Sequence, residues 1–103
     1  MVAAICAAPT VLAEAGILKG KQFTCYANAS YLELKAEVEG KGGMFENQPV
    51  VVSGHVITSQ GPGTAIEFGL AIVQALSHDK GPARVEKVKN AMLMPHCVGH
   101  VSA

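Results

Sequence analysis

The chain has 103 residues, of which 50% are hydrophobic and 16% are charged, and its formal net charge is zero. This composition predicts one small folded domain, at about 100–200 residues per domain, and excludes an intrinsically disordered chain. The basic residues are scattered, which excludes the basic patch of a nucleic-acid-binding protein. No apolar run reaches the roughly 18 residues of a membrane span, so no contact with a membrane is expected.

Cysteine usage gives a first indication of the compartment. The three cysteines, Cys6, Cys25 and Cys97, are odd in number and widely spaced. Such a set does not form a disulfide framework and is typical of reduced thiols inside the cell. The first residues also lack the basic stretch that opens a secretory signal. We therefore expect a cytoplasmic protein.

The first half of the chain is predicted to alternate strands and helices. The elements expected in chain order are a buried strand at Val2 to Ile5, a helix at Ala7 to Ala15, a short strand at Phe23 to Cys25, a helix at Ser30 to Val38 and a polar loop at Glu39 to Pro49. Pro9 falls in the first turn of its helix, where its missing N–H does no harm, and Gly16 fits the C-terminal cap.

The second half begins with the clearest β signal. β-branched runs at 50–52 and 55–59 flank Ser53-Gly54, which predicts a tight hairpin. Thr64 and Glu67 have the spacing of a capping box, so a helix is expected from Thr64. That helix, Ala65 to Ser77, is apolar almost all round and is expected to be covered by protein on most sides. A last amphipathic helix should begin at Pro82.

Alternation of strands and helices predicts an α/β fold with a mostly parallel sheet. Residues 1–94 are expected to form the domain and residues 95–103 an irregular tail. In a parallel sheet the loops that follow the strands meet at one edge. Cys6 and the loop Gly61-Pro62-Gly63-Thr64 both follow strands, so they are expected to lie at the same edge.

Cys6 has two interpretations. At a junction between strand and helix, its sulfur lies close to the free N–H groups of the first helical turn, which favour the thiolate. The N–H of Ala7 is then placed to bind an oxyanion. The alternative is a structural thiol, since free cysteines are among the most buried residues.

Other patterns carry less chemistry. The stretch "SQGPGT" (59–64) has the position of an anion-binding loop but lacks the Gly-Lys-Ser/Thr of a phosphate-binding motif. His96, Cys97 and His100 have ligand-like spacing, yet no second cysteine pair accompanies them. His55 and His78 show no pairing with Cys6. Neither a metal site nor a cofactor is expected.

Two motifs together resemble the ThiJ/PfpI superfamily, in particular the branch of the parkinsonism-associated deglycase and its bacterial ThiJ-like relatives. They are "AAICAAPTVLAEAGILKGK" (3–21) and "VITSQGPGTAIEFGLAIVQAL" (56–76). The resemblance extends from Val2 to about Leu93 and corresponds to the C-terminal half of a family member. It implies a flavodoxin-like three-layer sandwich, of which this chain holds that half.

The resemblance also implies a function. Cys6 takes the place of the family's readily oxidised cysteine, the nucleophile proposed to attack glyoxals, and Ala7 supplies the N–H beside its sulfur. The loop Gly61-Pro62-Gly63-Thr64 is implied to lie close to that cysteine. Family members are usually homodimers linked to oxidative stress, glyoxalase or deglycase activity and chaperone activity.

Three departures from the family pattern matter. The residue after Cys6 is alanine where the protease-like branch has histidine, so a peptidase triad is not expected. Tyr26 stands where the deglycase branch often has histidine, and a tyrosine is a poor base near neutral pH. The family's glutamate that tunes the cysteine belongs to the N-terminal half. We therefore expect a fragment, a split or truncated product, or a chain that needs a partner.

Three functional hypotheses follow. The first is a protein of oxidative and carbonyl stress that uses Cys6 on small carbonyl compounds. The second is a truncated, non-catalytic chaperone or binding module, either a homo-oligomer or paired with the missing half. The third, an amidotransferase-like hydrolase, is disfavoured because no suitable His-Glu pair is present.

Overall fold

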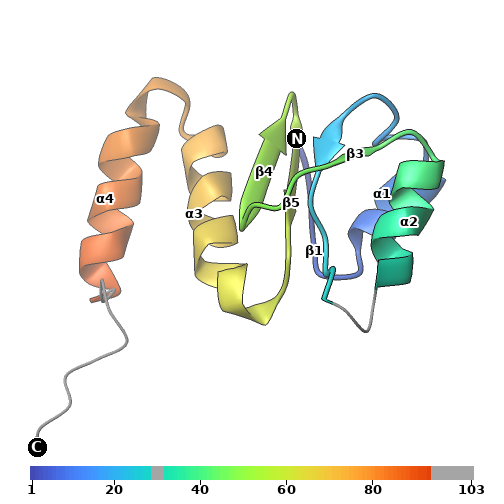
Figure 1. Cartoon of the computed structure of the whole chain (residues 1–103). Coiled ribbons are helices and arrows are strands. Elements are labelled where there is room, and N and C mark those ends of the chain that lie inside the picture. Colours follow the sequence, from blue (N-terminus) through green and yellow to red (C-terminus); the bar gives the residue numbers. More distant parts are fainter. Residues whose placement is uncertain (29–31, 94–103) are drawn as a thin grey trace, which may run out of the picture. The chain divides into compact units, whose positions relative to one another are not determined.

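The computed structural model of the protein describes residues 1–28 and 32–93. By internal contacts the chain divides into two compact units, Met1–Ile72 and Val73–Ala103. The elements in chain order are β1 (Val2–Ile5), α1 (Pro9–Glu14), β2 (Gln22–Phe23), α2 (Leu32–Gly40), β3 (Met44–Phe45), β4 (Val50–Ser53), β5 (Val56–Ser59), α3 (Ala65–Leu76) and α4 (Gly81–Ala91) (Figure 1). Short 3-10 helices precede α3 at Pro62–Thr64 and α4 at His78–Lys80.

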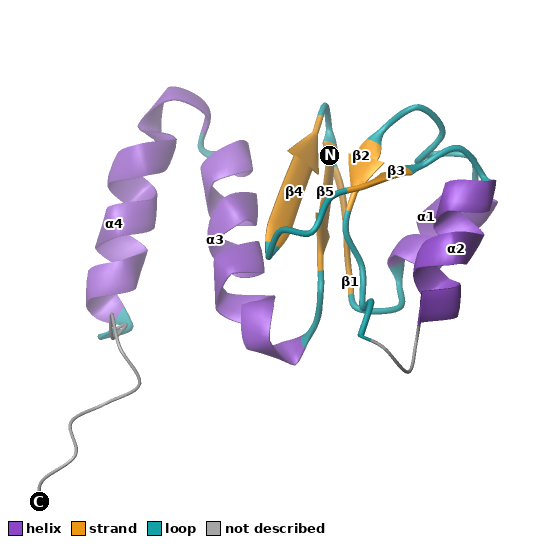
Figure 2. Ribbon diagram, viewed as in Figure 1, coloured by secondary structure: helices purple, strands orange, loops and turns teal. Residues whose placement is uncertain are grey.

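A three-stranded sheet in the order β1-β5-β4 carries the first unit (Figure 2). β1 runs parallel to β5, with Val2 opposite Val56 and Ile5 opposite Ser59. β4 and β5 form the predicted antiparallel hairpin, and its turn contains Gly54 at a φ of 60°. Parallel pairing places the ends of β1 and β5 at one edge, as the sequence predicted.

The loop predicted over Glu39 to Pro49 is wrong in part, because it contains β3, which pairs in parallel with β2. The pairing is driven by packing: the rings of Phe23 and Phe45 meet edge to face with centroids 5.6 Å apart. A Cβ on Gly43 would lie 2.9 Å from both the Phe23 ring and Val38 Cγ1. Two residues that follow Gly42-Gly43 carry too little β-pattern to be seen in the sequence.

The core of the first unit lies where α1, α2 and β2 meet. Its buried members are Ala13, Leu18, Phe23, Cys25, Val38 and Val56. α1 ends at Glu14, and Gly16 adopts the left-handed conformation (φ 77°) expected of a C-terminal cap. The predicted helices at 7–15 and 30–38 are thus confirmed with boundaries shifted by one or two residues.

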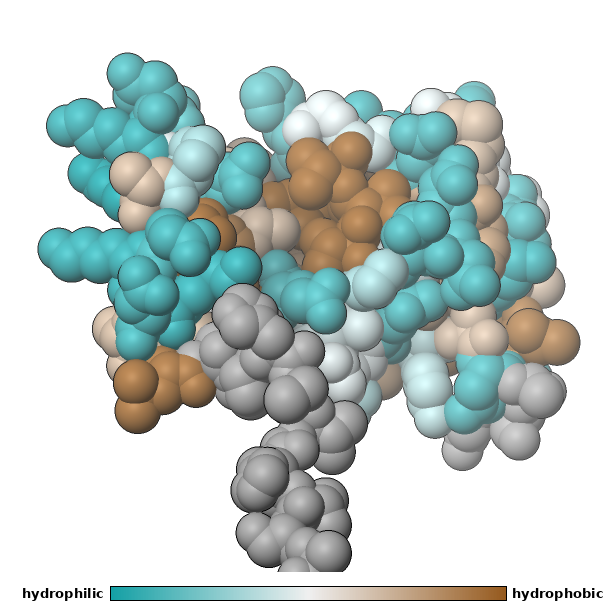
Figure 3. All heavy atoms as spheres, turned by 60° about the vertical axis from the view of Figure 1, so that its left-hand side comes forward, coloured by the Kyte–Doolittle hydropathy of each residue, from teal (hydrophilic) through white to brown (hydrophobic). Residues whose placement is uncertain are grey.

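Two predictions about α3 are wrong. Thr64 does not cap the helix through Glu67; its hydroxyl instead contacts Ser59 and Gly61. Nor is α3 covered, since none of its residues is buried among the described part of the chain, and Ile66 is 54% exposed. Apolar side chains reach the surface in the space-filling view (Figure 3).

The predicted tail over 95–103 lies outside the described residues, as do His96, Cys97 and His100. Among the described helices, none combines the length and the apolar character needed to cross a lipid bilayer.

Candidate functional site

Cys6 occupies a strained turn between β1 and α1. Its φ is 66°, a left-handed conformation that costs a non-glycine residue roughly 1–2 kcal/mol. Two hydrogen bonds hold the turn: the Cys6 N–H donates to the Ser59 carbonyl (3.1 Å), and the Ala8 N–H donates to the Ile5 carbonyl (3.1 Å). The side chain of Cys6 is partly exposed and its thiol is free. Strain of this kind in a non-glycine residue is typical of functional sites.

The amide of Ala7 lies in the same turn. Within the described residues it has no hydrogen-bond acceptor, whereas the Ala7 carbonyl accepts from both the N–H (3.1 Å) and the hydroxyl (2.7 Å) of Thr10. The carbonyl is therefore fixed while the N–H stays available beside Cys6. This is the arrangement an oxyanion-binding donor requires.

Tyr26 contacts both Cys6 and the loop after β5. Its N–H donates to the Cys6 carbonyl (2.9 Å), and a Cβ placed on Gly61 would lie 4.0 Å from Cδ2 of its ring. The amide of Asn28 donates to the Tyr26 hydroxyl (2.6 Å). The structure thus brings together Cys6, Tyr26 and Gly61, three of the predicted site residues.

The loop from Gly61 to Thr64 is built by a hydroxyl cluster. Ser59 Oγ lies 2.6 Å from both the Pro49 carbonyl and Thr64 Oγ1. Thr64 Oγ1 also accepts from the Gly61 N–H (3.2 Å). Pro62 and Gly63 form the 3-10 turn that this cluster closes.

Cys25 differs from Cys6 in burial, which is one of the properties that govern thiol reactivity. It is fully buried in the core. Burial raises the pKa of the Cys25 thiol to about 11, the negative charges of Glu39 and Cys6 act in the same direction, and Lys35 acts against them. Cys25 is therefore a neutral thiol at physiological pH and is inert as a nucleophile.

A cavity of about 230 Å³ lies beside the turn, lined by Tyr26, Ala27, Asn28 and Gln60. Tyr26 and Gln60 belong to the two segments that hydrogen-bond to the Cys6 backbone. Three of its four lining residues carry polar side chains, and its size suits a small molecule.

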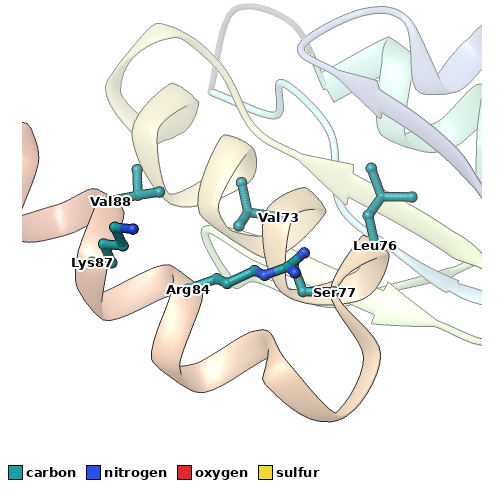
Figure 4. Close-up of a pocket in the computed structure, with 6 residues that line it drawn as sticks. All are labelled: Val73, Leu76, Ser77, Arg84, Lys87 and Val88. Atoms are coloured by element: carbon teal, nitrogen blue, oxygen red, sulfur yellow. The ribbon is translucent and has the colours of Figure 1, made fainter.

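The second unit holds a larger open pocket of about 430 Å³ (Figure 4). Val73, Leu76 and Ser77 line one wall, and Arg84, Lys87 and Val88 from α4 line the other. The lining contains no cysteine, histidine or carboxylate.

No histidine pairs with Cys6 among the residues that the structure describes in the first unit. The Val2 N–H donates to the His55 carbonyl (2.8 Å), which places His55 at the opposite end of β1 from Cys6. No cluster of three metal-ligating side chains occurs in the described ranges 1–28 and 32–93.

Sequence reasoning singled out the stretch 59–64 without naming Ser59 or Gln60 as site residues, and it missed Asn28. Ser59 carried a usable signal, because a hydroxyl that ends a buried strand must find partners in the next turn. Asn28 and Gln60 carried none, since their positions depend on how the loops fold.

Comparison with known proteins agrees with this geometry. The model of the DJ-1/PfpI family matches residues 1–75. The chain is 40% identical over 96 residues to protein dj-1beta of Drosophila melanogaster, an alignment that covers 93% of this chain and 47% of the fly protein. It is 39% identical over 98 residues to a Caenorhabditis elegans protein named glutathione-independent glyoxalase DJR-1.2, covering 95% of this chain and 46% of that one.

The fold agrees as well. The crystal structure of Drosophila melanogaster DJ-1beta superposes with a TM-score of 0.76 at 38% identity, covering 93% of this chain and 47% of that one. The chain therefore has the flavodoxin-like α/β fold of these proteins and spans about half the length of the curated relatives it matches. By its match over residues 1–75 and these relatives, the chain belongs to the DJ-1/PfpI family.

Proposed function

We propose that Cys6 is the nucleophile of a glyoxalase-type site that acts on small 2-oxoaldehydes and responds to oxidative stress. The observation that carries the proposal is the left-handed turn at Cys6, which presents a free thiol beside the unpaired amide of Ala7. The relative named glutathione-independent glyoxalase supports the substrate class.

The chemistry begins with addition. The Cys6 thiolate attacks the aldehyde carbon, a C–S bond forms, and the carbonyl electron pair moves to oxygen as an oxyanion. The Ala7 N–H donates a hydrogen bond to that oxyanion. Tyr26 and the strand end that leads into Gly61 to Thr64 both hydrogen-bond to the Cys6 backbone, which supports a role for them at the border of the adduct. Two free thiols, Cys6 and Cys25, fit a reducing compartment such as the cytoplasm.

The partner of this chain is the other half of the family fold or a second copy, docked along β1. Main-chain groups of Val2 and Cys6 face β5, so by alternation those of Ala3 and Ile5 face away from it. β1 ends the strand order of its sheet and offers this edge to an added strand.

A selective labelling experiment tests the role of Cys6. At pH 8 a thiol of pKa about 11 is ionised to about one part in a thousand. Cys6 is expected to react with iodoacetamide or limiting peroxide at least about tenfold faster than Cys25, as followed by peptide mass spectrometry. Equal labelling of all three cysteines would overturn the proposal.

The glyoxalase step needs its own assay. Consumption of methylglyoxal should occur in the wild-type chain, alone or with its partner, and should be lost in Cys6→Ser. Cys25→Ser, which removes a buried thiol, is the matched control and should retain activity.

A second function is favoured by a different observation. Among the described residues of α3 none is buried, although the helix is rich in apolar side chains. Such a surface suits a chaperone or binding module that does not use the thiol. Suppression of client aggregation that persists in Cys6→Ser would favour this function.

A further inference from the structure

We propose that Ser59 is a positioning residue that holds Cys6 in its reactive geometry. The inference rests on the proposed role of Cys6 and goes beyond it, since Ser59 acts through its neighbours without contacting a substrate. Ser59 is fully buried at the end of β5, opposite Ile5 in the sheet.

The main chain of Ser59 fixes one side of the turn. Its carbonyl accepts the N–H of Cys6 at 3.1 Å, directly after the last residue pair of β1 and β5. A shift of Ser59 therefore moves the amide of Cys6, and with it the strained φ of that residue.

The side chain of Ser59 fixes the loop. The hydroxyls of Ser59 and Thr64 have one proton each, and three contacts compete for them: Ser59 to the Pro49 carbonyl (2.6 Å), Ser59 with Thr64 (2.6 Å), and Thr64 to the Gly61 carbonyl (3.0 Å). The two shortest contacts are satisfied together when Ser59 donates to Pro49 and Thr64 donates to Ser59. The Gly61 carbonyl keeps the N–H of Thr64 (3.0 Å) as its donor.

These contacts close a ring around the site. Cys6 is joined to Ser59, Ser59 to Thr64, and Thr64 to Gly61. Gly61 lies against the ring of Tyr26, whose N–H returns to the Cys6 carbonyl. Removal of either the Ser59 or the Thr64 hydroxyl breaks the contact that ties the loop to β5 and leaves every backbone bond of Cys6 in place.

The test measures the iodoacetamide rate constants of Cys6 and Cys25 in one sample by peptide mass spectrometry. Ser59→Ala and Thr64→Val each remove one hydroxyl of the ring, and both should slow Cys6 about fivefold, equivalent to about 1 kcal/mol. Thr64→Ser keeps the hydroxyl and should restore the wild-type rate. The rate constant of Cys25 should stay unchanged throughout.

Thr24→Val is the matched control. Thr24 is as buried as Ser59, but its hydroxyl has no hydrogen-bond partner among the described residues, so its loss should leave Cys6 unaffected. A Cys6 rate within twofold of wild type in both Ser59→Ala and Thr64→Val overturns the inference. So does a parallel rise of Cys25 labelling, because it means that the fold opens. The ratio of the iodoacetamide rate constants of Cys6 and Cys25 in the wild-type chain tests the proposed function separately.

Discussion

At the scale of single residues, the left-handed backbone conformation of Cys6 should lower the free energy of unfolding by a measurable amount. A left-handed φ is unfavourable for alanine and free for glycine, although glycine loses more entropy on folding. Cys6→Gly should therefore be more stable than Cys6→Ala by about 0.5–1 kcal/mol. Urea unfolding of the two variants at equal pH gives the difference directly. A more stable alanine variant would contradict a strained turn.

Cys25 should make the fold sensitive to alkaline pH. Burial raises its pKa from 9.0 to about 11, so between these values the unfolded chain loses the proton and the folded chain keeps it. Ionisation then favours unfolding: the contribution of the thiol is complete below about pH 9 and is lost as pH rises toward 11, by up to about 3 kcal/mol. Urea unfolding from pH 8 to 10.5 should show this loss.

Other groups titrate in the same range, so the comparison is made with Cys25→Ala in a Cys6→Ser background. At pH 8 the free energy of unfolding of the double variant should be lower than that of Cys6→Ser, because the double variant loses packing. Its free energy of unfolding should also decrease less steeply as the pH rises. Parallel pH profiles for the two proteins would show that Cys25 ionises freely in the folded state.

Local sequence pattern predicts some features of these residues and not others. The place of Cys6 followed from local pattern, because a short apolar strand followed by small residues and Pro9 specifies a strand, a turn and a helix start. The hydroxyl partners of Thr64 did not follow from local pattern, because both Ser59 and Glu67 lie close to Thr64 in the sequence. In the folded chain the Thr64 hydroxyl contacts Ser59. Burial of Cys25 depends on α2, which no local pattern places over it.

At the scale of elements, β1 shows what one sequence pattern leaves open. Its wholly apolar run predicted a strand buried on both faces, and the strand is present, but only Ala4 is buried within it. Within the described sheet β1 pairs with β5 alone, and the composition of a strand does not encode how many neighbours it pairs with. By contrast, the β4–β5 hairpin was predictable, although its turn lies at Gly54 and His55, one residue later than predicted, because Ser53 pairs with Val56.

Proline substitutions can separate the two edges of β1. Ala4 faces its N–H toward β5, so Ala4→Pro removes a ladder bond and should strongly destabilise the chain. Ala3 faces away from β5, so Ala3→Pro should cost far less in the isolated chain. Thermal melting checks both expectations.

The same pair tests the proposed docking edge. Ala3→Pro should abolish assembly with an added strand while the isolated chain still melts cooperatively, as followed by light scattering after size exclusion. Assembly that survives Ala3→Pro would place the interface elsewhere.

At the scale of the whole molecule, the family match ends at residue 75, close to the boundary at Ile72 between the two compact units. The described sheet, the turn at Cys6 and the hydroxyl ring all belong to the first unit. The chain thus carries the thiol and its backbone environment within the part that defines the family. Among the described residues, β1 stays at the end of its sheet and the apolar side chains of α3 stay unburied.

That exposed apolar surface should govern the behaviour of the isolated chain in solution. Ile66 on α3 is 54% exposed, whereas Ile57 on β5 is 1% exposed. Because large exposed apolar side chains promote association, the wild-type chain should bind a hydrophobic dye and self-associate at micromolar concentration. Ile66→Glu should reduce both properties while changing the free energy of unfolding by less than about 0.5 kcal/mol. Ile57→Glu, the matched control, should unfold the chain, since it buries an unpaired charge. A monomeric wild-type chain that binds no dye would mean that α3 is covered without a partner.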